Sequence, residues 1–313
     1  MVIGESRAKD AYRRIAWGPW RAFLERCPPG WDYRANRALG VLAGIAAGQK
    51  RAQVVANLKR AFPHRTGLER VAIQAFGAHF SNQYASFAFG RIEPAVAGRW
   101  LRFEGTEHLD RAAHDGVGVV LIHPHMGPAQ LPLAVLGAAG RPVHQVGGGE
   151  VEGGKSVRGQ WASAERSRLE RRMKVTLHDG GSYLRALLRA LGEGAIVLTA
   201  CDGTGGGKEM GRRYDRLVLG QRMAVPVGGF YLAYRSGARL HTLYTVRDPT
   251  DPRRHLSTIG AEVPIDRAAS VDATLEAGAD FTAGWLSLLL SRHPGDWLFW
   301  DAFQPGGLLA GSP

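Results

Sequence analysis

The sequence predicts an α/β fold: a mixed, largely parallel sheet flanked by helices, with an N-terminal helical region before it. Up to about residue 100 the apolar side chains follow helical patterns, as in Ala52–Phe62, which ends at Pro63, and no strand-like run interrupts them. From Leu101 onward, short strand-like runs alternate with helical ones. This alternation is typical of a parallel sheet whose strands are connected by helices.

The same patterns place the individual elements and suggest two domains. We expect a helical, membrane-associating region over residues 1–100, which includes a helix within Gly67–Phe89, and an α/β domain over residues 101–313. The predicted strands are Val117–Ile122, Pro142–Val146, Ala195–Ala200 and Leu240–Val246. Helices are predicted at about 130–139, 156–173, 181–191 and 224–236, and the glycine clusters at 147–149 and 205–207 predict loops.

Composition and charge restrict the class of partner. The 313 residues are 45% hydrophobic and 22% charged, as in a folded protein, and the formal net charge is +12. Such a charge attracts phosphates, acidic carrier proteins, nucleic acid or anionic lipid headgroups. We expect no nucleic-acid partner, because no recognisable motif or aromatic platform accompanies the charge. The two cysteines, Cys27 and Cys201, favour a reducing compartment.

The N-terminal region is predicted to lie on an anionic membrane surface. Charged residues precede any apolar stretch, so no signal peptide is recognised, and the apolar run Ala38–Gly48 falls short of the roughly 20 residues that span a bilayer. The segment Ala11–Arg26 interleaves aromatic residues with four arginines, as interfacial helices do. Packing of this segment against the protein's own core is an equal alternative. We expect a peripheral protein on the cytoplasmic face of the inner (plasma) membrane.

His125 is the residue that points most directly to chemistry. It follows the apolar strand Gly116–Pro124 and opens the Gly/Pro-rich stretch His125–Gln130. Open α/β sheets bind ligands outside the carboxyl ends of their strands, and an imidazole is suited to act as a general base near neutral pH. A solvated loop histidine is the alternative interpretation.

Asp202 and Gln130 are the candidate partners of His125. Chain order places Asp202 at the same end of a neighbouring parallel strand, where its carboxylate can fix the imidazole tautomer that a base needs. Gly127 is predicted to leave room for substrate, and Pro128 to start a helix whose free amides stabilise an oxyanion.

The pair His123 and His125 also invites a zinc interpretation, because alternate residues of a strand point to the same face. No further ligands follow with the spacing of a metal site, and Cys201 and Asp202 are the nearest candidates. We therefore expect no metal.

A phosphate-binding loop is the alternative functional class. Gly149–Ser156 fits the pattern G-x-x-x-x-G-K-[ST], between a predicted strand and a predicted helix. Such a loop implies a nucleotide hydrolase, with Lys155 on the phosphates and Asp202 holding the metal. Glu150 and Glu152 count against this interpretation, because they bring carboxylates into the loop that receives phosphate.

Several motifs, taken in order, resemble the bacterial lipid A late acyltransferase family, which includes phosphatidylinositol-mannoside acyltransferases and is related to glycerolipid acyltransferases. The resemblance covers nearly the whole chain. The motifs that carry it are Asn57–Pro63, Leu101–Asp110, His125–Gln130, Gly194–Asp202, Gly220, Leu232–Ala238 and His293–Trp300.

The resemblance implies an enzyme that moves a fatty acyl group from an acyl thioester to a hydroxyl or amine of a lipid-like or glycolipid-like acceptor. The donor is coenzyme A or acyl carrier protein, used as co-substrate, and no cofactor is expected. His125 falls on the family's catalytic histidine, and Gln130 takes the place of an acidic residue. A glutamine carbonyl can still orient the imidazole but adds no charge, so Asp202 is expected to supply the charge. A catalytically degenerate relative that binds lipid or carrier is the alternative that Gln130 suggests.

The resemblance also implies that a basic helix following the 149–156 loop faces the substrate. Its cations are Arg158, Arg166, Arg168, Arg171, Arg172 and Lys174. The predicted substrate-binding residues are Arg168 and Arg172 from this group, Gly127 and His123 beside His125, and Arg222, which follows Gly220. The arginines are chosen because a guanidinium presents a fork of donors suited to phosphate.

Overall fold

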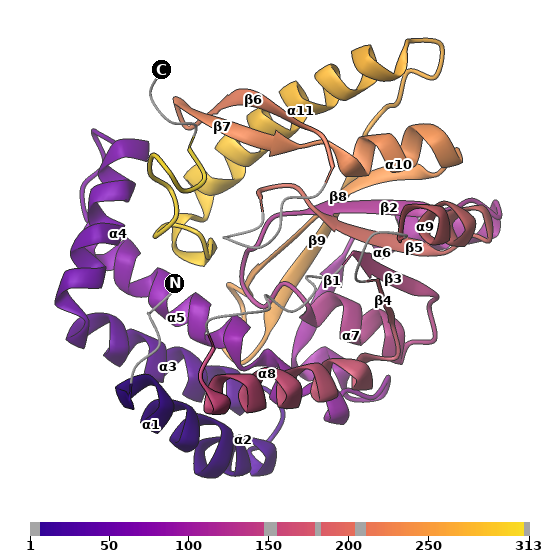
Figure 1. Ribbon diagram of the computed structural model, residues 1–313. Helices are drawn as coiled ribbons and strands as arrows, with labels where there is room; N and C mark the ends of the chain where they lie inside the picture. Colours follow the sequence, from indigo (N-terminus) through magenta and orange to yellow (C-terminus); the bar gives the residue numbers. More distant parts are fainter. Residues whose placement is uncertain (1–6, 147–154, 179–182, 204–210, 310–313) are drawn as a thin grey trace.

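The protein is described by a computed structural model over residues 7–146, 155–178, 183–203 and 211–309. Helices at the N-terminus pack beside a mixed sheet that is covered by helices on both faces (Figure 1). The α/β class and the N-terminal helical region predicted from sequence are therefore confirmed.

Helices make up the first part of the chain. The segment 11–26 is broken at Gly18 and Pro19, because Gly18 has non-helical angles (φ −101°, ψ −105°) and proline disrupts a helix interior. Short 3-10 turns connect the last long helix to the sheet. The elements are α1 (Arg7–Ile15), a π-helical segment (Ala16–Trp20), α2 (Arg21–Arg26), α3 (Trp31–Ala46), α4 (Gly48–Ala61), α5 (Leu68–Gln83) and 3-10 turns at Ala85–Phe87, Phe89–Arg91 and Ala97–Arg99.

The large sheet has seven strands in the order β1-β9-β8-β2-β5-β3-β4. Strands β8, β2, β5, β3 and β4 run parallel, whereas β8 pairs antiparallel with β9, which is parallel to β1. The strands are β1 (Leu101–Glu104), β2 (Val119–His123), β3 (Val143–Val146), β4 (Thr176–His178), β5 (Ile196–Ala200), β8 (Arg239–Arg247) and β9 (His255–Glu262). A separate antiparallel hairpin consists of β6 (Arg213–Val218) and β7 (Gln221–Pro226).

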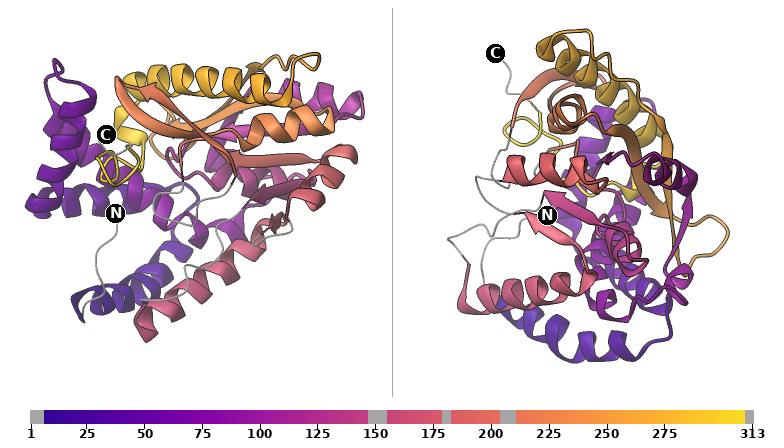
Figure 2. Two further views of the ribbon diagram at one scale, coloured as in Figure 1. Left: turned by 45° about the horizontal axis from the view of Figure 1, so that its top comes forward. Right: turned by 90° about the vertical axis from the view of Figure 1, so that its right-hand side faces the viewer.

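Helices cover both faces of the sheet (Figures 1 and 2). Alternate residues of β2 enter two different cores: Val120 and Ile122 pack with α9 and α10, while Val119 and Leu121 pack with α6 and α7. This is why β2 is apolar throughout, as expected of a strand buried on both faces. The helices are α6 (Thr106–His114), α7 (Leu131–Ala138), α8 (Val157–Glu170), α9 (Tyr183–Gly192), α10 (Gly228–Ser236) and α11 (Val271–Arg292), with 3-10 turns at Arg171–Met173 and Pro294–Asp296.

The four predicted strands are all present, and three of the four helices predicted for this part of the chain lie close to their predicted positions. The helix expected over 224–236 is wrong at its start, because Gln221–Pro226 forms the second strand of the hairpin and the helix begins at Gly228. The glycine clusters at 147–149 and 205–207 lie outside the described residues.

The N-terminal helices share a core with the sheet. Leu58 of α4 and Phe76 of α5 belong to the same buried cluster as Val197 of β5 and Leu286 of α11. The division of the chain into two domains at residue 100 stays a prediction. In the described part of the chain, none of the helices combines the length and apolar character that crossing a bilayer requires.

Asn57 connects α4 to the C-terminal segment. Its side chain is 2% exposed, and its Nδ2 donates to the carbonyl of Trp300 at 2.8 Å. We predict that Asn57→Ala lowers the free energy of unfolding by about 1–3 kcal/mol, because a buried carbonyl loses its donor. Urea denaturation measures this, with Lys59→Ala, an exposed position on the same helix, as control. Equal stability of the two variants would contradict the role given to Asn57.

Candidate active site

The site forms where two neighbouring parallel strands end. In the register of β2 with β5, His123 lies opposite Ala200. The next two residues of each strand, Pro124–His125 and Cys201–Asp202, therefore leave the sheet side by side. The expectation that Asp202 lies at the same end as His125 is met by this pairing.

Asp202 holds both the backbone and the side chain of His125. The ring Nδ1 of His125 lies 2.7 Å from Asp202 Oδ1, and the backbone amide of His125 donates to Asp202 Oδ2 at 2.7 Å. Since a carboxylate only accepts, Nδ1 carries the proton in the neutral ring and Nε2 keeps its lone pair. The His125 side chain is 29% exposed, so a ligand can reach it.

Asp202 is fully buried yet ionised. Its side chain has 0% exposure, and it accepts a third hydrogen bond, from Trp297 Nε1 at 2.8 Å. Burial by itself raises the pKa of Asp202, but the charge of His125 and the hydrogen bonds from His125 and Trp297 outweigh it and lower the pKa below its ordinary value. The site therefore retains a negative charge under the imidazole.

The C-terminal segment 296–299 closes the site from the other side. Leu298 donates its amide to the His125 carbonyl at 3.0 Å, and the rings of Phe299 and His125 lie 4.5 Å apart between centroids. Sequence reasoning assigned no role to Trp297 or Phe299, although both lie in the aromatic run His293–Trp300. The sequence feature that could have identified them is the high density of aromatic residues next to a Pro-Gly pair.

Close packing against Thr245 requires a glycine at position 127. Its φ is +52°, and a Cβ at this position would lie 2.9 Å from the Thr245 carbonyl oxygen. Its amide donates to the Asp296 carbonyl at 2.8 Å, and the Ala129 amide donates to Asn82 Oδ1 at 3.1 Å. These two amides are therefore not available to an oxyanion. The helix begins at Leu131 rather than at Pro128, and the role of its first amides stays a prediction, as does substrate binding by Gly127.

Gln130 makes a different contact from the one expected. Its Oε1 accepts from Arg166 Nη2 of α8 at 3.4 Å, and among the described residues no hydrogen bond joins it to His125. Asp202 occupies the orienting position at Nδ1 that was predicted for Gln130. A catalytic role for Gln130 stays a prediction.

His123 lies beneath the site. It is 4% exposed, its Nδ1 donates to the Pro124 carbonyl at 3.1 Å, and its ring is 5.7 Å from that of His125. Burial, followed by the charge of His125, lowers the pKa of His123 to about 4. The predicted contact of His123 with substrate therefore has little exposed surface to support it. No group of three or more metal-binding side chains occurs among the described residues.

The three predicted substrate-binding arginines lie outside this cluster. Arg168 pairs with Glu165 at 2.8 Å, and Arg222 pairs with Asp215 at 3.0 Å on the hairpin. Arg172 packs against Gly90, where a Cβ would lie 2.7 Å from its Nη1. The structure gives none of them a contact with His125 or Asp202, and their substrate roles stay predictions.

Most of the segment 149–156 that fits the phosphate-binding loop pattern, namely residues 149–154, lies outside the described residues. Its last two residues have structural contacts. Ser156 caps α8 by accepting from the Gly159 amide at 3.0 Å, and Lys155 Nζ donates to Ser163 Oγ at 2.8 Å.

The protein has one cavity at the end of β5 and another between helices. The first, of about 330 Å³, begins at the end of β5 with Thr199, Ala200 and Gly203 and is walled by apolar residues that include Leu232 and Leu275. The second, of about 390 Å³, lies between the N-terminal helices and α8. It contains Lys9, Arg13, Lys50 and Arg166 together with the rings of Tyr12, Trp17, Phe76, His79 and Phe80.

Residues 17–299 match the family described as bacterial lipid A biosynthesis acyltransferase. This match covers most of the chain, so the chain belongs to that family and is an acyltransferase acting on a lipid acceptor. No curated protein matches it.

The hydrogen bond from Trp297 to Asp202 yields a pH-dependent prediction. A carboxyl group with a lowered folded-state pKa adds stability above its unfolded pKa of about 4, and this stability is lost as the pH falls through the folded-state pKa. Trp297→Phe removes one donor, so we expect a loss of about 1–3 kcal/mol at pH 7 that shrinks below about pH 4.

Trp300→Phe is the matched control, because its Nε1 donates to a neutral acceptor, the Pro294 carbonyl, at 2.6 Å. Its loss of stability should not change over the same pH range in urea denaturation. Parallel pH profiles of the two variants would contradict a charge-stabilising contact at Trp297.

Proposed function

We propose that this member of the acyltransferase family transfers a fatty acyl group from an acyl thioester of coenzyme A or acyl carrier protein to a hydroxyl or amine of a lipid or glycolipid. His125 is the general base. The observation that carries the proposal is the 2.7 Å contact between His125 Nδ1 and the buried carboxylate of Asp202. It leaves Nε2 as the proton acceptor of a partly exposed ring.

The reaction follows from this geometry. His125 Nε2 takes the proton from the acceptor hydroxyl as its oxygen attacks the thioester carbonyl carbon, and Asp202 stabilises the imidazolium that forms. When the tetrahedral intermediate collapses, the C–S bond breaks and the thiolate leaves, taking up the proton from the imidazolium. The products are the acylated acceptor and a free thiol.

The first cavity suits the acyl chain. Its walls are mainly apolar, and it opens at the end of β5 next to Asp202, so a chain lying there brings its carbonyl toward His125. The buried Leu275 of α11, 1% exposed, lines it. An apolar cavity with few polar groups is the usual setting of such a ligand.

The second cavity suits the polar part of an amphipathic substrate. Its cations favour phosphate groups, and its aromatic rings favour apolar surface. Arg166 connects it to the site, because the same guanidinium that lines the cavity donates to Gln130, five residues after His125.

Exposed apolar side chains on the N-terminal helices and α8 favour a peripheral position on a membrane, and we propose that this is the cytoplasmic face of the inner membrane. Ile15 is 61% exposed, Phe23 52% and Val157 84%, and α1 and α2 lie beside α8 (Figures 1 and 2). Trp17 and Leu24 of the same segment are buried. The core interpretation of residues 11–26 therefore holds for Trp17 and Leu24, whereas the exposed Ile15 and Phe23 support the interfacial interpretation, which stays a proposal.

We predict that His125→Ala lowers acyl transfer by about 10²–10⁴-fold, because the base is lost. The assay is release of free thiol from a panel of acyl-CoA and acyl-carrier thioesters, with and without a mixed lipid extract. His64→Ala, at an exposed loop position, serves as control. Undiminished transfer by His125→Ala in a folded protein would sink the proposed mechanism.

Gln130→Ala is expected to lower transfer by less than about tenfold, because Asp202 rather than Gln130 holds the imidazole. Gln130→Glu places a carboxylate against Arg166 and should likewise leave turnover within about tenfold of the native level. The same thiol-release assay measures both. A loss from Gln130→Ala as large as that from His125→Ala would show that Gln130 acts on the base.

Replacement of exposed apolar side chains tests the membrane surface. Ile15→Gln with Phe23→Gln should weaken binding to phosphatidylglycerol vesicles by about tenfold or more, since two side chains no longer insert. Leu217→Gln with Leu288→Gln, 64% and 51% exposed elsewhere, is the matched control. Vesicle flotation that drops equally for both pairs would contradict the assigned face.

A further inference from the structure

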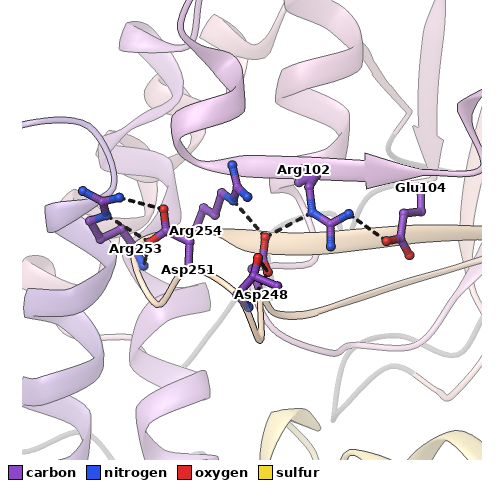
Figure 3. A network of polar contacts seen from close by, with 7 residues as sticks. Arg102, Glu104, Asp248, Asp251, Arg253 and Arg254 are labelled. Atoms are coloured by element: carbon purple, nitrogen blue, oxygen red, sulfur yellow. Dashed lines mark hydrogen bonds and ion pairs between the residues drawn. The ribbon is translucent and has the colours of Figure 1, made fainter.

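The turn that joins β8 to β9 contains a second polar cluster, separate from His125. At its base is Asp248, which has 0% side-chain exposure. It accepts from Arg102 Nε at 3.2 Å and from Arg254 Nε at 2.8 Å (Figure 3). Burial raises the pKa of Asp248, but hydrogen bonds from Thr250, Arg254 and Arg102 outweigh it and hold the pKa well below its ordinary value. Asp248 therefore fixes Arg254 in place.

Arg253, in the same turn, is also held by an ion pair. Arg253 donates from Nε and Nη2 to the two carboxylate oxygens of Asp251, each at 2.9 Å. The turn between α2 and α3 packs closely against Arg253 and Arg99. A Cβ at Gly30 would lie 2.7 Å from the Arg253 carbonyl oxygen and 2.8 Å from the Arg99 carbonyl oxygen. The backbones at Gly30, Arg99 and Arg253, from three separate segments of the chain, are therefore in close contact.

A cavity of about 380 Å³ opens there. Its charged lining is three arginines, Arg99, Arg253 and Arg254, against one carboxylate, Asp251. The Arg254 contact to Asp248 uses Nε alone, and the Arg99 side chain makes no hydrogen bond or ion pair with any residue that the structure describes. Guanidinium N–H groups are therefore left over for a ligand.

The rim of the cavity is aromatic. Trp31 lines it and is 46% exposed, and the guanidinium of Arg34 lies over its ring at 4.6 Å. Pro28 and Pro29 complete this apolar wall. The cavity thus combines a surplus of guanidinium donors on one side with an apolar surface on the other.

We propose that this cavity, formed by Arg99, Arg253, Arg254 and Trp31, is a binding site for a phosphate ester. The planar forks of arginine match the oxygens of a phosphate, and the positive charge of Arg99 remains after Arg253 is paired with Asp251 and Arg254 with Asp248. The volume exceeds what a phosphate ion needs, so the organic part of the ester lies along Trp31 and the prolines. The ester is either a lipid headgroup or a small phosphate monoester in solution.

The test measures binding to the full chain, so it does not depend on acyl transfer. Glycerol 3-phosphate and inorganic phosphate are titrated by calorimetry, and phosphatidylcholine vesicles with and without phosphatidic acid are tested by flotation. The variant is Arg99→Gln with Arg253→Gln. The matched control, Arg235→Gln with Arg292→Gln, removes the same charge from exposed positions elsewhere.

We expect the site variant to bind its ligand at least tenfold more weakly than the native chain, while the control stays within about twofold, since each lost charge-assisted hydrogen bond costs roughly that much. A loss seen with glycerol 3-phosphate identifies a soluble ester, and a loss seen only with phosphatidic acid vesicles identifies a lipid headgroup. Equal binding by the two variants to every probe would overturn the proposal. Arg99→Gln alone breaks no ion pair among the described residues, so weaker binding by this single variant cannot be explained by a folding defect.

Discussion

The hydrogen-bonded contact between the buried Asp202 carboxylate and His125 is the constraint on which the site depends. A charge without solvent exposure is stable only when donors surround it, and here the donors are the His125 ring, the His125 amide and the Trp297 indole. The same three bonds fix the ring orientation, the course of the backbone after β2 and the position of the C-terminal segment. Loss of any one of them affects the other two.

Distant parts of the chain are needed to keep these donors in place. Trp297 packs edge-on against Trp300 and Phe303, and the Trp300 carbonyl is held by Asn57 of α4. Asn82 at the end of α5 holds the amide of Ala129 in the loop after His125. The N-terminal helices therefore support the site as well as carrying the exposed apolar side chains.

The sequence was most informative where local pattern and chain order decide the structure. Apolar runs located β2, β3, β5 and β8, and parallel strand order placed Asp202 beside His125. Other strands were missed: β1 and β4 are short strands at the edges of the sheet, the longer β9 mixes polar with apolar residues, and the hairpin strand Gln221–Pro226 was partly interpreted as helix.

Within the site, side-chain geometry could not be predicted from spacing. Gln130 occupies the place in the motif where an acidic residue was expected, yet it contacts Arg166 because the turn through Gly127 directs it toward α8. Trp297 reaches Asp202 from 95 residues farther along the chain. Contacts of this range depend on how whole elements pack, so a single sequence contains no direct signal for them.

The most direct test of this account is the tautomer of His125, read by nitrogen-15 NMR of histidine-labelled protein at a pH where the ring is neutral, with His125→Gln to assign the signal. The account predicts a proton on Nδ1 and an unprotonated Nε2 in the native chain, and loss of this fixed state in Asp202→Asn. A proton on Nε2 in the native chain would contradict the account, because the ring could not then accept the proton of an acceptor hydroxyl through that atom.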